Sequence, residues 1–189
     1  MNPAVFLDRD GVIYRAMIRD GLPYPPASLD EAELLPGVEE AMRAMRERGY
    51  RLIVVTNQPD VGKGVQRREV VEAMHEHMRR LLPIDDVKVC YHVDADGCSC
   101  RKPNAGMLLE AAREWSLDLR QSFMVGDRWR DIGAGRAAGC KTILIKSEYR
   151  ERQAESPDAV VASLYEASAL ILSDLSHLPT NPGVTHGYS

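Results

Sequence analysis

The feature that most constrains the fold of this chain is a repeated alternation of short apolar runs with longer stretches of helical period. Such an alternation is typical of βαβ units, in which helices connect parallel strands and cover both faces of their sheet. The runs expected as strands are residues 4–7, 51–56, 87–91, 122–125 and 141–145. The stretches expected as helices are residues 37–48, 67–82, 105–115, 131–138 and 162–172. The sequence therefore predicts an α/β fold with a doubly wound parallel sheet.

Two segments depart from this alternation. Residues 14–36 contain four prolines, so we predict a long irregular loop there, of the kind that usually has a function. Residues 174–189 combine prolines and glycines with little apolar periodicity, and we expect a tail that is poorly ordered or held by a neighbouring segment. The 189 residues suffice for one compact domain, which we place at residues 1–173.

Charge and hydropathy exclude several classes of function. The 24 basic and 28 acidic residues give a net charge of -4, so the chain lacks the basic footprint of a nucleic-acid-binding protein. Its apolar runs fall far short of the roughly 20 residues that span a bilayer. Its first residues lack the basic and apolar regions of a secretory signal. We therefore expect a cytoplasmic monomer without nucleic-acid or membrane partners.

Acidic residues follow two of the predicted strands where those strands end. Asp8 and Asp10 follow the first strand, and Asp127 and Asp131 follow the fourth. Because open α/β sheets bind ligands beyond the carboxyl ends of their strands, we expect these side chains to meet there. Converging carboxylates repel one another unless a cation neutralises them, and such hard oxygen ligands suit Mg²⁺. The alternative, that these residues cap helices or turns, stays open above all for Asp131.

Four short motifs in this chain resemble those of a known superfamily. They are DRDGVI at residues 8–13, TNQ at 56–58, RKP at 101–103 and GDR at 126–128. In this order they resemble the first to fourth motifs of the haloacid dehalogenase superfamily of phosphotransferases. The resemblance covers roughly residues 4–145, and it implies a doubly wound core of the kind already predicted.

The resemblance also implies a Mg²⁺-dependent phosphomonoester hydrolase that works through an aspartyl-phosphate intermediate. Asp8 would be the nucleophile and Asp10 the general acid and base. The metal would be held by the carboxylates of Asp8 and Asp127 and by the backbone carbonyl of Asp10. Thr56 and Lys102 would stabilise the transferring phosphoryl group.

Three of the four cysteines gather in the segment 90–102, which we call the zinc loop. Its C-x-H-x5-C-x-C pattern offers Cys90, His92, Cys98 and Cys100 as ligands, enough to close a tetrahedral zinc site with no position left for water. Such a zinc ion would be structural. The alternative is a disulfide, which would use only two thiols and is disfavoured in a reducing compartment. Cys140 is expected to be a buried small residue.

The zinc loop followed by the RKP motif resembles one branch of the superfamily, which holds heptose-bisphosphate and histidinol-phosphate phosphatases. In this branch the zinc loop would present Arg101 and Lys102 to the substrate. The residues expected to contact substrate are Asn57, Gln58, Arg101 and Arg128. The intervals between the motifs leave no room for a large cap domain, so only the loop 14–36 and the zinc loop would cover the site.

The two kinds of phosphatase in this branch differ in substrate. The short interval between His92 and Cys98 resembles the histidinol-phosphate type, whereas the stretches 102–108 and 61–64 resemble the heptose type. We expect a small phosphorylated metabolite, D-glycero-D-manno-heptose 1,7-bisphosphate losing its 7-phosphate, with histidinol phosphate of histidine biosynthesis as the alternative. A catalytically idle, metal-stabilised binding protein on the same fold is a third hypothesis, against which the intact motif residues argue.

Overall fold

Six strands form one sheet at the centre of residues 2–173, the part of the chain that the computed structural model describes. They are β1 (Ala4–Leu7), β4 (Arg51–Asn57), β5 (Asp86–Cys90), β6 (Phe123–Gly126), β7 (Lys141–Ile145) and β8 (Ala159–Val161). Their order is β5-β4-β1-β6-β7-β8, and every neighbouring pair is parallel. Five of these six strands were predicted and are confirmed, and the sixth, the short β8, was not predicted.

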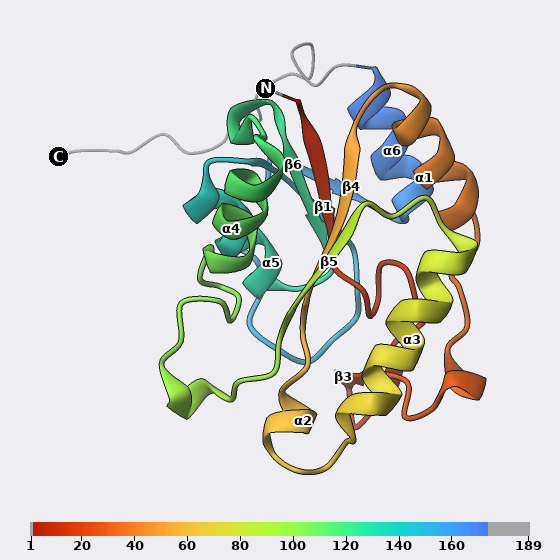
Figure 1. Cartoon of the computed structure of the whole chain (residues 1–189), viewed down its shortest axis with the longest axis vertical. Helices are drawn as coiled ribbons and strands as arrows, with labels where there is room; N and C mark the ends of the chain where they lie inside the picture. Colours follow the sequence, from red (N-terminus) through yellow and green to blue (C-terminus); the bar gives the residue numbers. More distant parts are fainter. Residues whose placement is uncertain (1, 174–189) are drawn as a thin grey trace, which may run out of the picture.

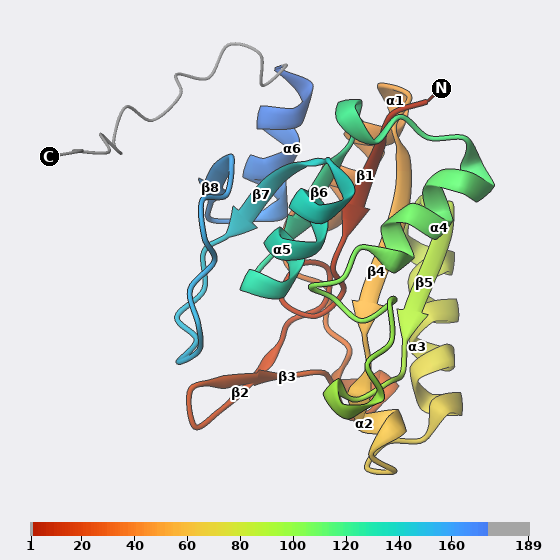
Figure 2. The same cartoon turned by 90° about the vertical axis from the view of Figure 1, so that its left-hand side faces the viewer.

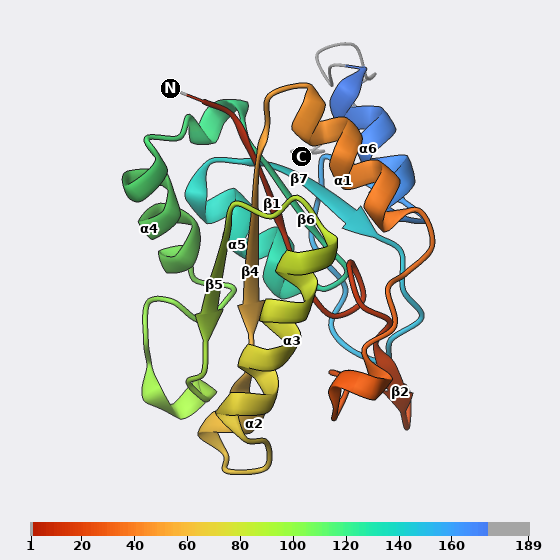
Figure 3. The ribbon, with the colours of Figure 1, turned by 45° about the vertical axis from the view of Figure 1, so that its right-hand side comes forward.

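Helices cover both faces of this sheet. They are α1 (Val38–Glu47), α2 (Pro59–Gly62), α3 (Arg68–Leu81), α4 (Gly106–Trp115), α5 (Trp129–Ala138) and α6 (Leu164–Leu172). Helices α1, α3 and α6 lie on one face, and α4 and α5 lie on the other (Figure 1, Figure 2). On the first face α1 and α6 lie side by side, and α3 runs along β4 (Figure 3). The structure is the predicted doubly wound α/β fold.

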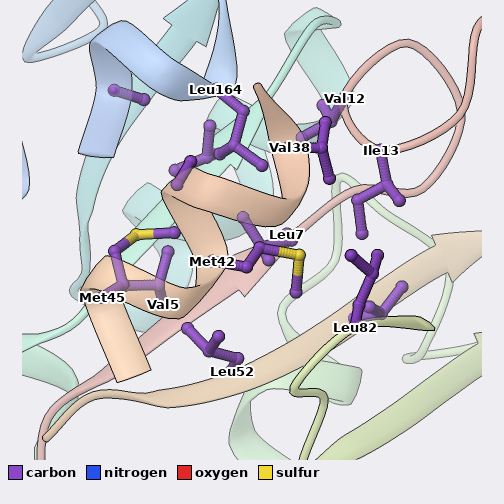
Figure 4. Close-up of a cluster of buried hydrophobic side chains, with 14 of the residues drawn as sticks. Val5, Leu7, Val12, Ile13, Val38, Met42, Met45, Leu52, Leu82 and Leu164 are labelled. Atoms are coloured by element: carbon purple, nitrogen blue, oxygen red, sulfur yellow. The ribbon is translucent and has the colours of Figure 1, made fainter. Parts of the chain in front are cut away.

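The core under α1 shows how the helical period becomes packing. Met42 and Met45 point from one face of α1 toward Val5 and Leu7 of β1, with Leu164 of α6 beside them (Figure 4). All five side chains are buried. Because β1 is covered on both faces, its four residues are apolar throughout and do not alternate with polar ones.

The strand order creates one position at the sheet edge suited to a ligand site. Strand β1 lies between β4 and β6, because the chain leaves β1 toward one edge of the sheet and later returns on its other side. Open α/β sheets bind ligands at such a switch point, beyond the carboxyl ends of the strands. Asp8 follows β1, Thr56 lies near the end of β4, and Asp127 follows β6.

The segment 14–36 differs from the irregular loop that was predicted. It contains an antiparallel hairpin of β2 (Met17–Arg19) and β3 (Leu22–Tyr24), followed by a short 3-10 helix, Leu29–Glu31. Asp20 and Gly21 at the tip have φ angles of 53° and 78°, the left-handed conformation that two-residue hairpin turns require. This Asp-Gly pair was the sequence indication of a hairpin. Pro23 is tolerated because a two-stranded ribbon has only edge strands.

Insertions into the sheet are small throughout residues 2–173. They are the β2–β3 hairpin, the single turn of α2 and the zinc loop with its 3-10 helix Asp94–Asp96, so the expectation of no large cap domain is confirmed. No helix in this range is long and apolar enough to cross a membrane. The predicted tail, residues 174–189, lies outside the described residues.

Candidate active site

A pocket of about 240 Å³ lies at the switch point of the sheet. Its lining includes Asp8, Asp10 and Lys102, together with residues 22–25 of the β2–β3 hairpin and the residue after it. Figure 2 shows this hairpin beyond the carboxyl end of β1. Basic side chains line much of the remainder: Lys63, Arg101, Arg128 and Arg130. A pocket with carboxylates at its base and cations around its walls is suited to an anionic ligand bound together with a metal ion.

Three carboxylates converge at the base of this pocket. Oxygen atoms of Asp8, Asp127 and Asp131 lie within 4.8 Å of one another. Asp127 is only 3% exposed, and its Oδ1 atom has no hydrogen-bond partner among the described residues. Burial raises the pKa of Asp127 well above its usual value, and the negative charges of Asp8 and Asp131 add to this rise. A buried, unpartnered carboxylate oxygen beside two further carboxylates fits a hard cation such as Mg²⁺.

Lys102 is the positive charge that this cluster contains. Its Nζ atom lies 2.9 Å from Asp8 Oδ1 and 2.5 Å from Asp131 Oδ1, and it donates to the carbonyl of Val55 at 2.7 Å. Burial alone lowers the pKa of Lys102, but the carboxylates of Asp131 and Asp8 raise it above its usual value. Asn57 fixes the backbone of Lys102, since its amide side chain bonds both the N–H and the carbonyl of that residue. The ammonium group is therefore charged and held in place.

Asp131 both caps a helix and belongs to the carboxylate cluster, the two roles that the sequence left open. Its Oδ2 accepts from the backbone N–H of Arg128 at 3.0 Å, as a capping residue of α5 does. Its Oδ1 pairs with Lys102 inside the carboxylate cluster. Burial raises the pKa of Asp131 to about 6, Lys102 opposes this rise, and Asp8 adds to it. The sequence placed Asp131 in the acidic cluster after the fourth strand but assigned it no catalytic or metal-binding role.

A second network orients Asp10. The fully buried Arg9 donates from Nε and Nη2 to the two carboxylate oxygens of Asp10, each at 3.0 Å. Gln58 donates from Nε2 to Asp10 at 2.8 Å and to the hydroxyl of Thr56 at 2.9 Å. Arg9 in turn lies 3.0 Å from Nε2 of His75 on α3. Both oxygens of Asp10 therefore have fixed partners, which hold the carboxyl group in one orientation.

Sequence reasoning missed Arg9 and His75. Arg9 occupies the variable position of the DRDG motif, where nothing in the local pattern distinguishes a buried arginine from an exposed one. His75 lies in a helix 66 positions further along the chain and meets Arg9 only in the folded state.

The remaining expected substrate residues lie around the pocket wall. Arg101 pairs through Nε with Asp94 of the zinc loop at 2.6 Å. Arg130 pairs with the same carboxylate at 3.3 Å. Arg128 pairs with Glu151 through its Nε atom at 2.8 Å. Each of the three arginines also lines the pocket, so acidic residues outside it hold the guanidinium groups in position.

The four expected zinc ligands form a second cluster, at the end of β5. The sulfur of Cys90 lies 3.7 Å from that of Cys98 and 3.2 Å from that of Cys100, and Nδ1 of His92 lies 3.6 Å and 3.3 Å from Cys90 and Cys100. Thiolates about 2.3 Å from one tetrahedral centre lie roughly 3.8 Å apart, so the donor set and its spacing fit zinc. All four cysteines of the chain are free, which excludes the disulfide alternative in this structure. Cys140 is buried, as expected.

Comparison with known proteins agrees with this site. A family model described as HAD-hydrolase-like matches residues 99–167. The chain is 35% identical to the D-glycero-beta-D-manno-heptose-1,7-bisphosphate 7-phosphatase of Photorhabdus laumondii, over 94% of this chain and 93% of that protein. It is 32% identical to the D-glycero-D-manno-heptose-1,7-bisphosphate 7-phosphatase of Thermosynechococcus vestitus, over 93% and 98% of the two chains.

The chain belongs to the heptose-1,7-bisphosphate 7-phosphatase family. A solved structure of D,D-heptose 1,7-bisphosphate phosphatase from B. bronchiseptica, complexed with magnesium and phosphate, resembles it with a TM-score of 0.75 and 28% identity, over 90% of this chain and 98% of that one. The predicted membership of the haloacid dehalogenase superfamily is therefore confirmed. The magnesium of that phosphatase structure agrees with the metal that the carboxylate cluster of this family member fits.

The zinc cluster of this phosphatase generates a prediction about stability. Changing both Cys98 and Cys100 to Ser removes two thiolate ligands, so the purified chain should lose its zinc, which we expect at about one ion per wild-type chain. Without zinc the loop should become more mobile, so the midpoint of thermal unfolding should fall. Arg101 and Lys102 should then move from their positions, so activity should fall as well. Metal content, thermal unfolding and phosphate release are the measurements. Cys140→Ser is the matched control and should keep its zinc; a double variant as active and as stable as the wild type would contradict a structural zinc.

The buried His75 generates a prediction about pH. Burial, together with the charges of Arg9 and Arg79, lowers the pKa of His75 to about 3. In the unfolded chain a histidine titrates near about 6.5. Below that pH the unfolded state binds a proton that the native state does not, so the free energy of unfolding falls as pH falls, by up to about 1.4 kcal/mol per pH unit for this one group.

Urea unfolding of the wild type and of His75→Gln at several pH values between 5 and 8 measures this contribution. The wild type should lose stability relative to the variant as the pH drops below about 6.5, and the difference between the two should be constant above that value. A difference that does not change with pH would show that His75 titrates alike in both states.

Proposed function

We propose that this chain hydrolyses the 7-phosphate of D-glycero-D-manno-heptose 1,7-bisphosphate in a Mg²⁺-dependent reaction. The observation that carries the proposal is the identity of 35%, over 94% of the chain, with the D-glycero-beta-D-manno-heptose-1,7-bisphosphate 7-phosphatase of Photorhabdus laumondii. The pocket supports it, because carboxylates and Lys102 stand at its base and arginines stand around it. We also propose that the chain acts as a monomer in the cytoplasm, as expected from its sequence.

We assign the role of nucleophile to Asp8. One of its carboxylate oxygens attacks phosphorus, the new O–P bond forms, and the bond from phosphorus to the sugar oxygen breaks. Lys102, whose Nζ atom lies 2.9 Å from Asp8, supplies positive charge to the phosphoryl oxygens. The hydroxyl of Thr56 holds a further phosphoryl oxygen. The product of this step is an aspartyl-phosphate and a leaving alcohol that needs a proton.

We assign the proton transfers to Asp10. Its carboxyl group donates a proton to the leaving sugar oxygen, and its carboxylate then takes a proton from the water that attacks the aspartyl-phosphate. This second attack breaks the bond between Asp8 and phosphorus and releases inorganic phosphate. Arg9 and Gln58 keep Asp10 in one orientation for both transfers. Gln58, which was expected from the sequence to contact substrate, is therefore assigned to orienting Asp10 and Thr56.

The carboxylates of Asp8 and Asp127 and the backbone carbonyl of Asp10 would hold the magnesium ion. When bound, it supplies positive charge that neutralises the phosphoryl oxygens and the carboxylate cluster. We propose that Arg101 and Arg128 bind the second phosphate of the substrate, and that Asn57 contributes by holding Lys102 at the pocket wall. Zinc on Cys90, His92, Cys98 and Cys100 is structural in this proposal.

The test is a comparison of phosphate release with Mg²⁺ from heptose 1,7-bisphosphate, histidinol phosphate and p-nitrophenyl phosphate. Charge-assisted bonds from two arginines to a second phosphate contribute about 3 kcal/mol, so kcat/KM should favour the bisphosphate by about 100-fold or more. Phosphorus NMR of the product should show a remaining 1-phosphate. Faster release from histidinol phosphate would favour the alternative, and release from none of the three would favour an idle binding protein.

Asp8→Asn tests the assignment of the nucleophile. The amide keeps the size of the side chain but lacks the nucleophilic oxygen, so phosphate release should fall by at least about 10⁴-fold. The far-ultraviolet circular dichroism should match that of the wild type, since the fold does not depend on this charge. Turnover that persists in the folded variant would show that another group attacks phosphorus.

A further inference from the structure

The loop between β7 and β8, residues 146–158, extends beyond the end of the sheet toward the tip of the β2–β3 hairpin (Figure 2). Tyr149 in this loop donates its hydroxyl hydrogen to Oδ2 of Asp127, with the oxygens 2.6 Å apart. Ser147 donates to the backbone carbonyl of the same residue at 3.2 Å. Neither residue belongs to the motifs singled out in the sequence, yet both contact the carboxylate residue that follows β6.

The hydroxyl of Tyr149 makes the two oxygens of Asp127 different. Oδ2 is occupied by the phenol, whereas Oδ1 is buried and has no partner among the described residues. A cation at the carboxylate cluster would therefore find Oδ1 available and Oδ2 already bonded.

The DRDG turn confines this arrangement from the other side. A Cβ atom on Gly11, which has a φ angle of 87°, would lie 1.8 Å from Oδ2 of Asp127 and 2.9 Å from the hydroxyl of Tyr149. The phenol and the carboxylate thus pack directly on the backbone of the turn that follows the two catalytic aspartates. Asp127 has little freedom to rotate while that contact persists.

Two further contacts hold Tyr149 in place. Glu151 pairs with Arg128, the residue after Asp127, at 2.8 Å. The backbone N–H of Arg150 donates to the carbonyl of Gly21 at the tip of the β2–β3 hairpin, at 2.7 Å. The loop is thereby tied both to the end of β6 and to the β2–β3 hairpin, by the two residues that directly follow Tyr149.

We propose that Tyr149 is a positioning residue for the magnesium ligand Asp127: its hydroxyl holds Oδ2 and leaves Oδ1 for the metal ion. This inference rests on the proposed function, because it takes Asp127 as a ligand of magnesium. Tyr149 does not line the substrate pocket, so its effect reaches the reaction only through Asp127. Partners of this kind typically change metal affinity by about 10- to 100-fold.

The test is titration of the purified full-length chain with Mg²⁺ alone in a calorimeter. Tyr149→Phe keeps the ring and removes the hydroxyl, and its dissociation constant for Mg²⁺ should rise about 10- to 100-fold. The matched control is Tyr165→Phe on α6, half exposed and outside the pocket, which should bind Mg²⁺ like the wild type. In assays with substrate, Tyr149→Phe should need more Mg²⁺ for half-maximal rate, while its kcat at saturating Mg²⁺ should stay within a few-fold of the wild type.

Equal Mg²⁺ affinity of Tyr149→Phe and the wild type would overturn the inference. Thermal unfolding without added Mg²⁺ checks that the variant is folded. If it is not, Glu151→Gln is the second test. This variant weakens the attachment of the loop to Arg128 and keeps the phenol of Tyr149. Its affinity for Mg²⁺ should fall, and an unchanged affinity would overturn the inference. Failure of the proposed function is distinct, because it would appear in the wild type as an absence of Mg²⁺-dependent phosphate release.

Discussion

The mutual repulsion of three buried carboxylates is the constraint on which the rest of this structure depends. Asp8, Asp127 and Asp131 come within 4.8 Å of one another at the end of the sheet, in surroundings where charges interact more strongly than in water. Lys102 supplies one positive charge to this cluster. The segments around the cluster position this lysine and leave space for a second cation. Both charges are needed because the sheet and its helices do not neutralise the three carboxylates on their own.

The zinc loop helps to hold Lys102 in its position beside the carboxylates. The lysine comes from a segment that crosses from β5 to α4 with little apolar core of its own, so the loop needs another source of rigidity. The cluster of three sulfurs and one imidazole provides it two residues before Lys102, and Asn57 of β4 holds the lysine backbone directly. Metal ligation and backbone hydrogen bonding therefore perform here the role that a large apolar interface performs elsewhere.

The elements that could be predicted from the sequence are those whose evidence is local. Apolar runs and helical periods predicted five strands and five helices, and strand-terminal acids and cysteine spacing predicted both metal clusters. Strand β8 was missed because it is short and partly exposed, and the β2–β3 hairpin because the proline content outweighed one Asp-Gly pair. Arg9, His75 and Tyr149 were missed for another reason: their partners are set by tertiary packing, which no short pattern records.

The two ligand clusters stand near the same edge of one sheet and differ in chemical softness. Thiolates and an imidazole follow β5, whereas only carboxylates follow β1 and β6. Zinc binds most donor sets more tightly than magnesium does, so affinity alone would not keep the ions apart. The cluster of cysteines and His92 binds zinc more favourably than the carboxylates do. The carboxylate cluster is therefore available to magnesium, the harder and more abundant ion. A single small domain can in this way sort two metals by the polarisability of its own side chains.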